Sequence, residues 1–248
     1  MNGSKSIKNK FLDLELGYHN VDNFYIRTSI QKALDRYLWV FSGKLLDVGC
    51  GEMPYREYVL SKSRVVEYVG CDIDNPTYQK DNKPDIFWNG NKIPLDDASI
   101  DCVIATELFE HIPDIDSVLK ELNRVLKPNG ALFFTVPFLW PLHDIPYDEY
   151  RYTPFALKRI FEGAGYTNIT INSLGGWDAA LATMLGLWLK RSPMSNEDRK
   201  KYMEEFFPFY QTLIEQSFSK SDLKYEDMIS QSIMITGLYG VIYKHTHS

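Results

Sequence analysis

Apolar and polar residues alternate along the chain in a way that predicts short strands separated by amphipathic helices. Apolar runs typical of strands occupy residues 44–49, 65–72, 85–89, 101–106, 131–136, 167–174 and 233–245. After the fourth run, apolar residues recur at helical spacing from Ile115 to Leu126, and the Pro-Asn-Gly run at 128–130 is expected to end that helix. Strand–helix–strand repeats of this kind predict an α/β, doubly wound fold whose mostly parallel sheet is covered on both faces.

The end signals of two later helices are clear. Thr153 is expected to cap a helix whose first position is Pro154, and Gly165 suits its C-terminal end. Ser195 begins a capping box, and Pro208 should kink or break the helix that follows it. Roughly 55 to 60 residues separate the last two strands, far more than an ordinary connection.

These patterns predict a single domain spanning residues 1–248, with four parts. Residues 1–43 form an N-terminal helical cap, whose clearest stretch is "SIQKALDRYLWVF", and residues 44–175 form the core. Residues 176–232 form a helical insertion before the closing strand in 233–248. A chain of this length can bury one sizeable core.

Composition narrows the class of protein. Apolar residues make up 44% and charged residues 24%, and the net charge is −6, which argues against a nucleic-acid partner. The three cysteines lack framework or CxxC spacing, and no His and carboxylate spacing indicates a metal. The N-terminus lacks a signal-peptide core, and the run "AALATMLGLWL" is too short to span a membrane. We therefore expect a cytoplasmic protein without a membrane span.

The stretch "LLDVGCGEMPY" joins an apolar run to a glycine turn of the kind that cradles a cofactor. It lacks the lysine and the Ser or Thr of a phosphate-binding Walker loop. A dinucleotide fingerprint would have a third glycine where this chain has Pro54. Proline there removes an N–H group that a phosphate would use, so the turn favours a ligand without phosphates.

Two acidic residues point to the same ligand. Asp47, at the end of the first strand, would repel a diphosphate but attract an ammonium or sulfonium group. Asp72 ends the second strand, where a carboxylate can accept hydrogen bonds from two ribose hydroxyls. S-adenosylmethionine has a ribose and a cationic tail but no phosphate, and it is the predicted cofactor.

With these motifs, the chain resembles the class I, Rossmann-like S-adenosylmethionine-dependent methyltransferases over residues 40–175 and the final strand. "LLDVGCG" is similar to the first motif of that family and "YVGCDID" to its acidic second motif. "WNGNKIPLDDASIDCVIATELFEHIPD" and "LKPNGALFFTVP" are similar to the segments around its fourth and fifth strands. The resemblance implies a seven-stranded sheet, methyl transfer, and S-adenosyl-L-homocysteine as product.

The resemblance also implies which residues contact the donor. Its methionine part would lie against the glycine turn, with Asp47 orienting its amino group. The residues implied at this end are Asp47, Gly49, Cys50, Gly51, Thr106 and Glu107. Asp72 would hold the ribose, Ile73 would lie beside the adenine, and Asn89 and Gly90 would lie at the adenine edge, where the family usually has an aspartate. Taken singly, the glycines could serve only to form a tight turn, and Asp72 could serve only to cap a helix, without binding a ligand.

The loop at residues 137–154 follows the fifth strand and carries the candidate acceptor site. Methyl transfer to a hydroxyl requires removal of a proton, and histidine is the usual base near neutral pH. His143, beside Asp144, is the preferred base, and His111 is its rival. Tyr147, Tyr150 and Arg151 would shape or grip the acceptor. An amine acceptor that binds neutral would need no base.

A purely structural interpretation of the same loop stays open. Arg151 and Asp148 could pair to brace the loop while His143 caps a turn.

The turn and the loop together resemble a subgroup of bacterial methyltransferases associated with polysaccharide and glycan biosynthesis. This likeness implies O-methylation of a sugar hydroxyl, with a small-molecule or glycan acceptor. The alternatives are a non-catalytic S-adenosylmethionine-binding partner subunit and an NAD-dependent reductase. The helical insertion could act as a lid, a substrate platform or the contact of a homo-oligomer.

Overall fold

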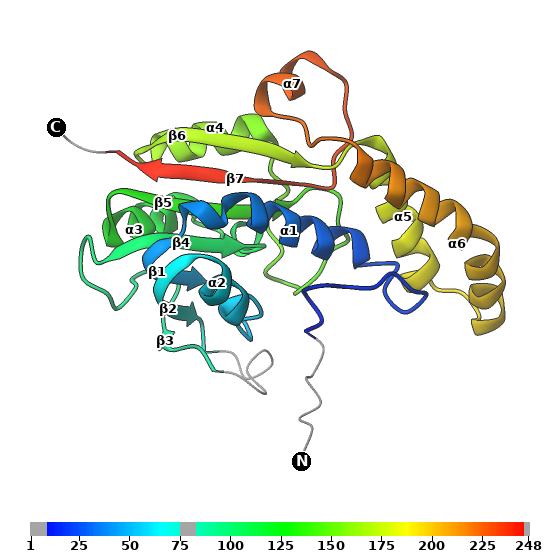
Figure 1. The fold of residues 1–248 in the computed structure, drawn as a ribbon, viewed down its shortest axis with the longest axis horizontal. Coiled ribbons are helices and arrows are strands. Elements are labelled where there is room, and N and C mark those ends of the chain that lie inside the picture. The colour runs from blue at the N-terminus through cyan, green and yellow to red at the C-terminus, as the bar shows by residue number, and fades with distance from the viewer. Residues whose placement is uncertain (1–8, 75–82, 246–248) are drawn as a thin grey trace.

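The computed structural model describes residues 9–74 and 83–245, which form one seven-stranded sheet with helices on both faces (Figure 1). The strand order is β3-β2-β1-β4-β5-β7-β6, and only β7 runs antiparallel to its neighbours. The strands are β1 (Ser42–Val48), β2 (Arg64–Asp72), β3 (Ile86–Phe87), β4 (Ile100–Thr106), β5 (Leu126–Pro137), β6 (Tyr166–Leu174) and β7 (Gly237–Lys244). The predicted doubly wound α/β fold is confirmed.

The helices include two short 3-10 turns and seven α-helices in the described residues. Their bounds are α1 (Phe24–Tyr37), η1 (Leu38–Val40), α2 (Arg56–Lys62), η2 (Phe109–His111), α3 (Ile115–Val125), α4 (Pro154–Gly163), α5 (Trp177–Arg191), α6 (Asn196–Ser219) and α7 (Tyr225–Ser230). The Thr153 and Ser195 side chains accept hydrogen bonds from the amides of Ala156 and Asp198, which confirms both predicted caps. None of the helices in the described ranges is long and apolar enough to cross a membrane.

The structure differs from the expected helix ends in two places. The helix from Ile115 ends at Val125, and the chain enters β5 at Leu126, which pairs with Ile100 of β4. The Pro-Asn-Gly run therefore lies in the strand and does not end the helix. Pro208 lies inside α6, which continues without a break to Ser219. The packing of α6 on its neighbours outweighs the hydrogen bond that proline removes.

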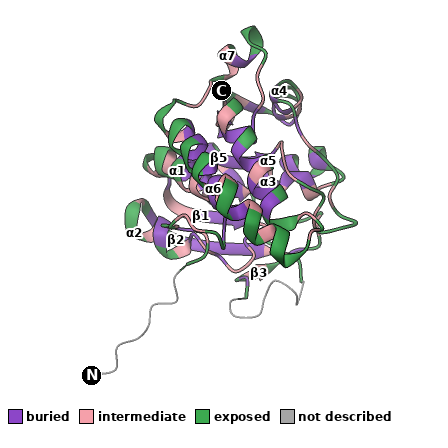
Figure 2. Cartoon of the chain, turned by 90° about the vertical axis from the view of Figure 1, so that its right-hand side faces the viewer, coloured by how far each residue is buried: buried purple, intermediate pink, exposed green. Residues whose placement is uncertain are grey.

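The central strands are apolar on both faces because helices cover both sides of the sheet. Successive residues of β5 show this: Phe133 packs in the apolar cluster with α1 and α2, whereas Phe134 packs in the cluster with α3 and α4. Both side chains are fully buried. In Figure 2 purple is concentrated on the strands near the centre of the molecule, and green lies mainly on the outer faces of the surrounding helices and on loops.

A third apolar cluster holds the helical insertion against the segment before α1. The Tyr210 hydroxyl of α6 donates a 2.8 Å hydrogen bond to the Val21 carbonyl. Gly186 of α5 lies so close that a Cβ atom there would stand 2.1 Å from the same carbonyl oxygen. Arg191, at the end of α5, bonds Asp22 at 2.8 Å. The insertion and the N-terminal cap therefore meet beside the carboxyl ends of the central strands.

Candidate active site

A cavity of about 600 Å³ opens at the carboxyl ends of β1 and β4. Its inner wall is the glycine turn after β1 and the tip of β4, and its outer wall comes from the cap, the loop after β5 and the end of α5. The residues that line it are Lys10, Phe11, Asn23, Ile26, Arg27, Ile30, Asp47, Gly49, Cys50, Gly51, Glu52, Pro54, Tyr55, Thr106, Glu107, His111, Trp140, His143, Asp144 and Arg191. The methionine-end residues and both histidines predicted from sequence thus share one space.

The glycine turn is held by main-chain hydrogen bonds. The amides of Gly49 and Cys50 donate to the Cys71 carbonyl of β2, and the Gly51 amide donates to Asp72 Oδ2 at 2.7 Å. Gly49 has φ +72°, and a Cβ atom there would lie 2.8 Å from the Leu108 side chain. Glycine is therefore required by both conformation and space, and the turn leaves a smooth backbone wall on the cavity.

Asp47 lies beneath this wall, 1% exposed, and its Oδ2 accepts a 2.5 Å hydrogen bond from the Tyr68 hydroxyl. Burial raises the pKa of Asp47 to about 7, although the Tyr68 hydrogen bond opposes that shift. A cationic group in the cavity would favour the charged carboxylate.

Glu107 occupies the tip of β4 with φ +49°. Its amide donates to the Thr135 carbonyl, and the Thr135 hydroxyl donates to Glu107 Oε1 at 2.7 Å. Burial raises the pKa of Glu107 to about 7. Glu107 and the neighbouring Thr106 both line the cavity, and their contact with the donor remains a prediction.

The residues expected at the adenosine end lie outside the described lining of the cavity. The two carboxylate oxygens of Asp72 accept the amides of Gly51 and Ile73, so in this structure Asp72 braces the glycine turn. Asn89 Oδ1 accepts the amides of Asn91 and Lys92, which uses its two lone pairs within its own turn. Gly90 follows with φ +81°. Contacts of these residues with adenosine remain predictions.

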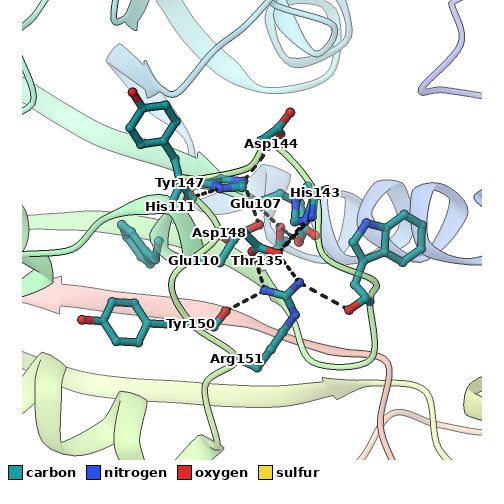
Figure 3. A network of polar contacts seen from close by, with 12 residues as sticks. Glu107, Glu110, His111, Thr135, His143, Asp144, Tyr147, Asp148, Tyr150 and Arg151 are labelled. Atoms are coloured by element: carbon teal, nitrogen blue, oxygen red, sulfur yellow. Dashed lines mark hydrogen bonds and ion pairs between the residues drawn. The ribbon is translucent and has the colours of Figure 1, made fainter.

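The two candidate bases are close neighbours, with ring centroids 4.8 Å apart (Figure 3). His111 Nδ1 lies 2.9 Å from the Tyr147 carbonyl oxygen, an acceptor, so a neutral ring here carries its proton on Nδ1 and its lone pair on Nε2. That Nε2 lies 4.0 Å from Asp144 and 3.7 Å from Glu110. His143 Nδ1 instead lies 3.3 Å from Asp148. Asp144, which adjoins His143 in the sequence, faces His111 instead.

Arg151 braces the loop that follows β5. Its guanidinium binds both carboxylate oxygens of Asp148, at 2.7 and 2.9 Å, and donates to the carbonyls of Trp140, Pro141 and Tyr150. The arginine lowers the pKa of Asp148 far below its usual range. These contacts match the structural interpretation of this pair. The Tyr147 side chain is 67% exposed and points away from the histidines (Figure 3).

Comparison with known proteins agrees with this geometry. A family model described as a methyltransferase domain matches residues 46–134, which include the glycine turn and the tip of β4. A demethylmenaquinone methyltransferase of Staphylococcus saprophyticus is 26% identical over 206 residues, covering 66% of this chain and 87% of the relative. With this match, the chain resembles the class I S-adenosylmethionine-dependent methyltransferases. It is an enzyme whose cofactor is S-adenosylmethionine.

Solved structures share the fold of this methyltransferase. The methyltransferase in complex with the Haloferax volcanii Trm112 activator superimposes with a TM-score of 0.56 at 17% identity, covering 88% of this chain and 89% of that one. Phosphoethanolamine N-methyltransferase 2 of Haemonchus contortus gives 0.55 at 15% identity, covering 88% of this chain and 53% of that one.

Sequence reasoning missed several residues of this methyltransferase site. Arg27 of α1, Arg191 of α5 and Trp140 line the cavity, and the Arg191 guanidinium lies 5.0 Å from the Trp140 ring centre. They come from three separate parts of the chain, and no local motif links them. Glu110, next to His111, was also missed, although a glutamate beside a buried phenylalanine in "LFEHIPD" was a usable signal.

Proposed function

We propose that this methyltransferase transfers a methyl group to a hydroxyl oxygen of a small polar acceptor, a sugar or a glycan unit. The observation that carries the proposal is the outer wall of the cavity, where the Trp140 ring lies among His111, His143, Asp144 and Arg191. A flat aromatic surface beside many hydrogen-bonding groups suits a sugar ring, whose faces are apolar and whose edges are polar.

Donor binding is proposed for the inner wall. S-adenosylmethionine supplies an electrophilic methyl group on a positively charged sulfur. The two left-handed glycines leave room for a ligand to approach the backbone, and Asp47 and Glu107 put two carboxyl groups on the same side of the cavity. Such carboxyl groups favour a cationic ligand over a phosphate. Asp72 is proposed to accept the ribose hydroxyls with the lone pairs that the Gly51 and Ile73 amides leave unused.

The hydroxyl proton is proposed to leave through the group formed by His111 and His143. Both rings line the cavity, and the Tyr147 carbonyl oxygen favours the tautomer of a neutral His111 ring that carries its proton on Nδ1. Asp148 and Arg151 hold the loop that carries His143, so their role is positioning.

The organisation as one domain with a cap and an insertion is also a proposal. It is supported by the Arg191–Asp22 contact, which joins the insertion to the cap at the cavity wall. Self-association through the insertion stays a prediction. Size-exclusion chromatography with light scattering measures it directly.

The test has two stages. Calorimetric titration with S-adenosylhomocysteine, with NAD as control, should show saturable binding of the first ligand only. Labelled S-adenosylmethionine is then offered with a panel of nucleotide sugars and glycans, and with demethylmenaquinone, the acceptor named for the Staphylococcus relative. Mass spectrometry should find an O-methyl group on a sugar. Methylation of the quinone, or of an amine, without any sugar product would refute the proposed acceptor class.

A further inference from the structure

Glu110 is the least expected group near the cavity. It is 0% exposed, and neither of its carboxylate oxygens accepts a hydrogen bond from another described residue. Buried carboxylates in folded proteins are almost always paired or hydrogen-bonded, because removing them from water is costly. A carboxylate kept in this state indicates a partner that the polypeptide alone does not provide.

The groups around Glu110 identify the chemistry of that partner. Ligand atoms of Glu110, His111 and His143 all lie within 4.8 Å of one another. A transition metal bound at about 2.0–2.2 Å holds neighbouring ligand atoms roughly 3 to 3.5 Å apart, so small side-chain rotations would close the set. Glu110 Oε1 and His111 Nε2 are already 3.7 Å apart.

The surrounding contacts hold this set as they do in metal sites. A metal-binding histidine usually donates its other ring N–H to a carbonyl or carboxylate, as His111 Nδ1 does to the Tyr147 carbonyl. The Glu110 carbonyl accepts the amides of Glu149 and Tyr150, at 2.9 and 3.1 Å, which ties the loop after β5 to η2. The same loop carries His143, so the backbone keeps all three side chains together before any ligand binds.

We propose that Glu110, His111 and His143 bind one divalent transition-metal ion at the acceptor end of the cavity. Two imidazoles and one carboxylate favour zinc, cobalt or iron(II) over magnesium, which prefers an all-oxygen set. Three protein ligands leave coordination positions open, as in catalytic zinc sites. Asp144, whose Oδ2 lies 4.0 Å from His111 Nε2, borders the open side.

If the proposed O-methylation is right, these open positions have a use. With the metal bound, His111 and His143 are ligands and no longer bases, so an acceptor hydroxyl coordinated there would lose its proton to solvent, because the cation stabilises the alkoxide. The oxygen then forms a bond to the methyl carbon while the carbon–sulfur bond breaks, and that electron pair stays on sulfur as neutral S-adenosylhomocysteine. The metal site would deepen the proposed function, but its existence does not depend on the acceptor.

The test is a cobalt titration of the purified full-length protein after chelator treatment, without donor or acceptor. Cobalt(II) bound by nitrogen and oxygen ligands in a low-symmetry site gains visible absorption, so the spectrum reports the ligands and not activity. We expect one cobalt ion per chain and competition by zinc. Glu110→Gln and His143→Asn should each weaken binding at least tenfold.

His19→Ala is the matched control, because it removes an exposed histidine that is not among the described cavity residues. It should titrate like the wild type. Circular dichroism confirms folding, and His111→Gln serves as a further ligand variant if one of the others fails to fold. No visible absorption with the wild type, or equal binding by all variants, would overturn the metal site. Donor binding measured by calorimetry would still stand in that case, so the two proposals fail separately.

Discussion

The proposed ribose contact of Asp72 allows a quantitative prediction. Asp72 Oδ2 accepts the Gly51 amide at 2.7 Å, and Oδ1 accepts the Ile73 amide at 2.7 Å. Burial raises the pKa of Asp72, whereas these two backbone hydrogen bonds lower it. A carboxylate in this position both braces the glycine turn and presents its remaining lone pairs to the ligand. Asp72→Ala removes both functions.

The expected loss follows from the energy of hydrogen bonds to charged groups. Such bonds contribute about 1.5–3 kcal/mol, and each 1.4 kcal/mol is a factor of ten in affinity. Asp72→Ala should therefore weaken S-adenosylhomocysteine binding about 10- to 150-fold. Calorimetric titration measures the dissociation constant. The affinity of Asp72→Asn should fall between those of the wild type and Asp72→Ala, because the single side-chain oxygen of asparagine keeps part of the acceptor capacity.

Asp74→Ala is the control for charge. Asp74 is exposed and lies two residues further along the same chain segment, so its removal changes the net charge equally. It should bind the product within about twofold of the wild type, because exposed charges are screened by solvent and salt. A folded Asp72→Ala protein with unchanged affinity would refute the ribose assignment. Equal losses of affinity in both variants would show that Asp72 acts on the ligand only through its negative charge.

Two further predictions concern stability. The pKa of Asp47 is about 7 in the folded protein against 3.8 as its ordinary value, so the folded state holds the extra proton and loses stability as pH rises between them. Relative to Asp47→Asn, the wild type should therefore lose about 2 kcal/mol of unfolding free energy between about pH 5 and pH 7, as measured by urea titration. If the difference in unfolding free energy between the two proteins stays the same across this pH range, the raised pKa of the buried carboxyl group is contradicted. Gly240→Ala would place a Cβ atom 1.8 Å from the Thr170 carbonyl oxygen, so we expect a loss of about 1–3 kcal/mol in urea unfolding. Gly163→Ala is the control and should leave the unfolding free energy unchanged, because no atom lies within 4 Å of its Cβ position. An unchanged urea midpoint for Gly240→Ala would refute the close approach of β7 to β6.

The sheet and its helices were predictable because the packing repeats along the chain. Each central strand is a short apolar run, and α3 carries an apolar face that repeats at helical spacing. The errors lie where two elements compete for the same residues. Leu126 continues the helical pattern of α3, but its pairing with Ile100 places it in β5. The spacing of apolar residues in the sequence does not reveal that pairing between strands.

The side of the cavity that is proposed to hold the donor was also predictable as a cluster of residues, since Asp47 and the two glycines follow one another in a single motif. The other side was not, because Glu110 and His143 are brought together by contacts between distant backbone groups. The amides of Glu149 and Tyr150 bind the Glu110 carbonyl, and no side-chain pattern encodes such a contact. The side-chain oxygen of Asn89 illustrates the reverse case, in which a residue type suited to a ligand is used by its own turn.

The position of β7 also bears on how the protein is made. This strand lies between β5 and β6 and pairs with both, but it follows β6 in the chain by the whole helical insertion. During synthesis, β6 therefore leaves the ribosome before the strand that lies between it and β5. The sheet stays incomplete while residues 175–236 are synthesised. Residues 42–137 can assemble their five parallel strands early, but before β7 emerges the described backbone partners of β6 are limited to the short contact with Leu223 and Lys224. Completion of the sheet is thus a late event, and the exposed edge of β5 is the segment that a nascent chain has to protect from aggregation.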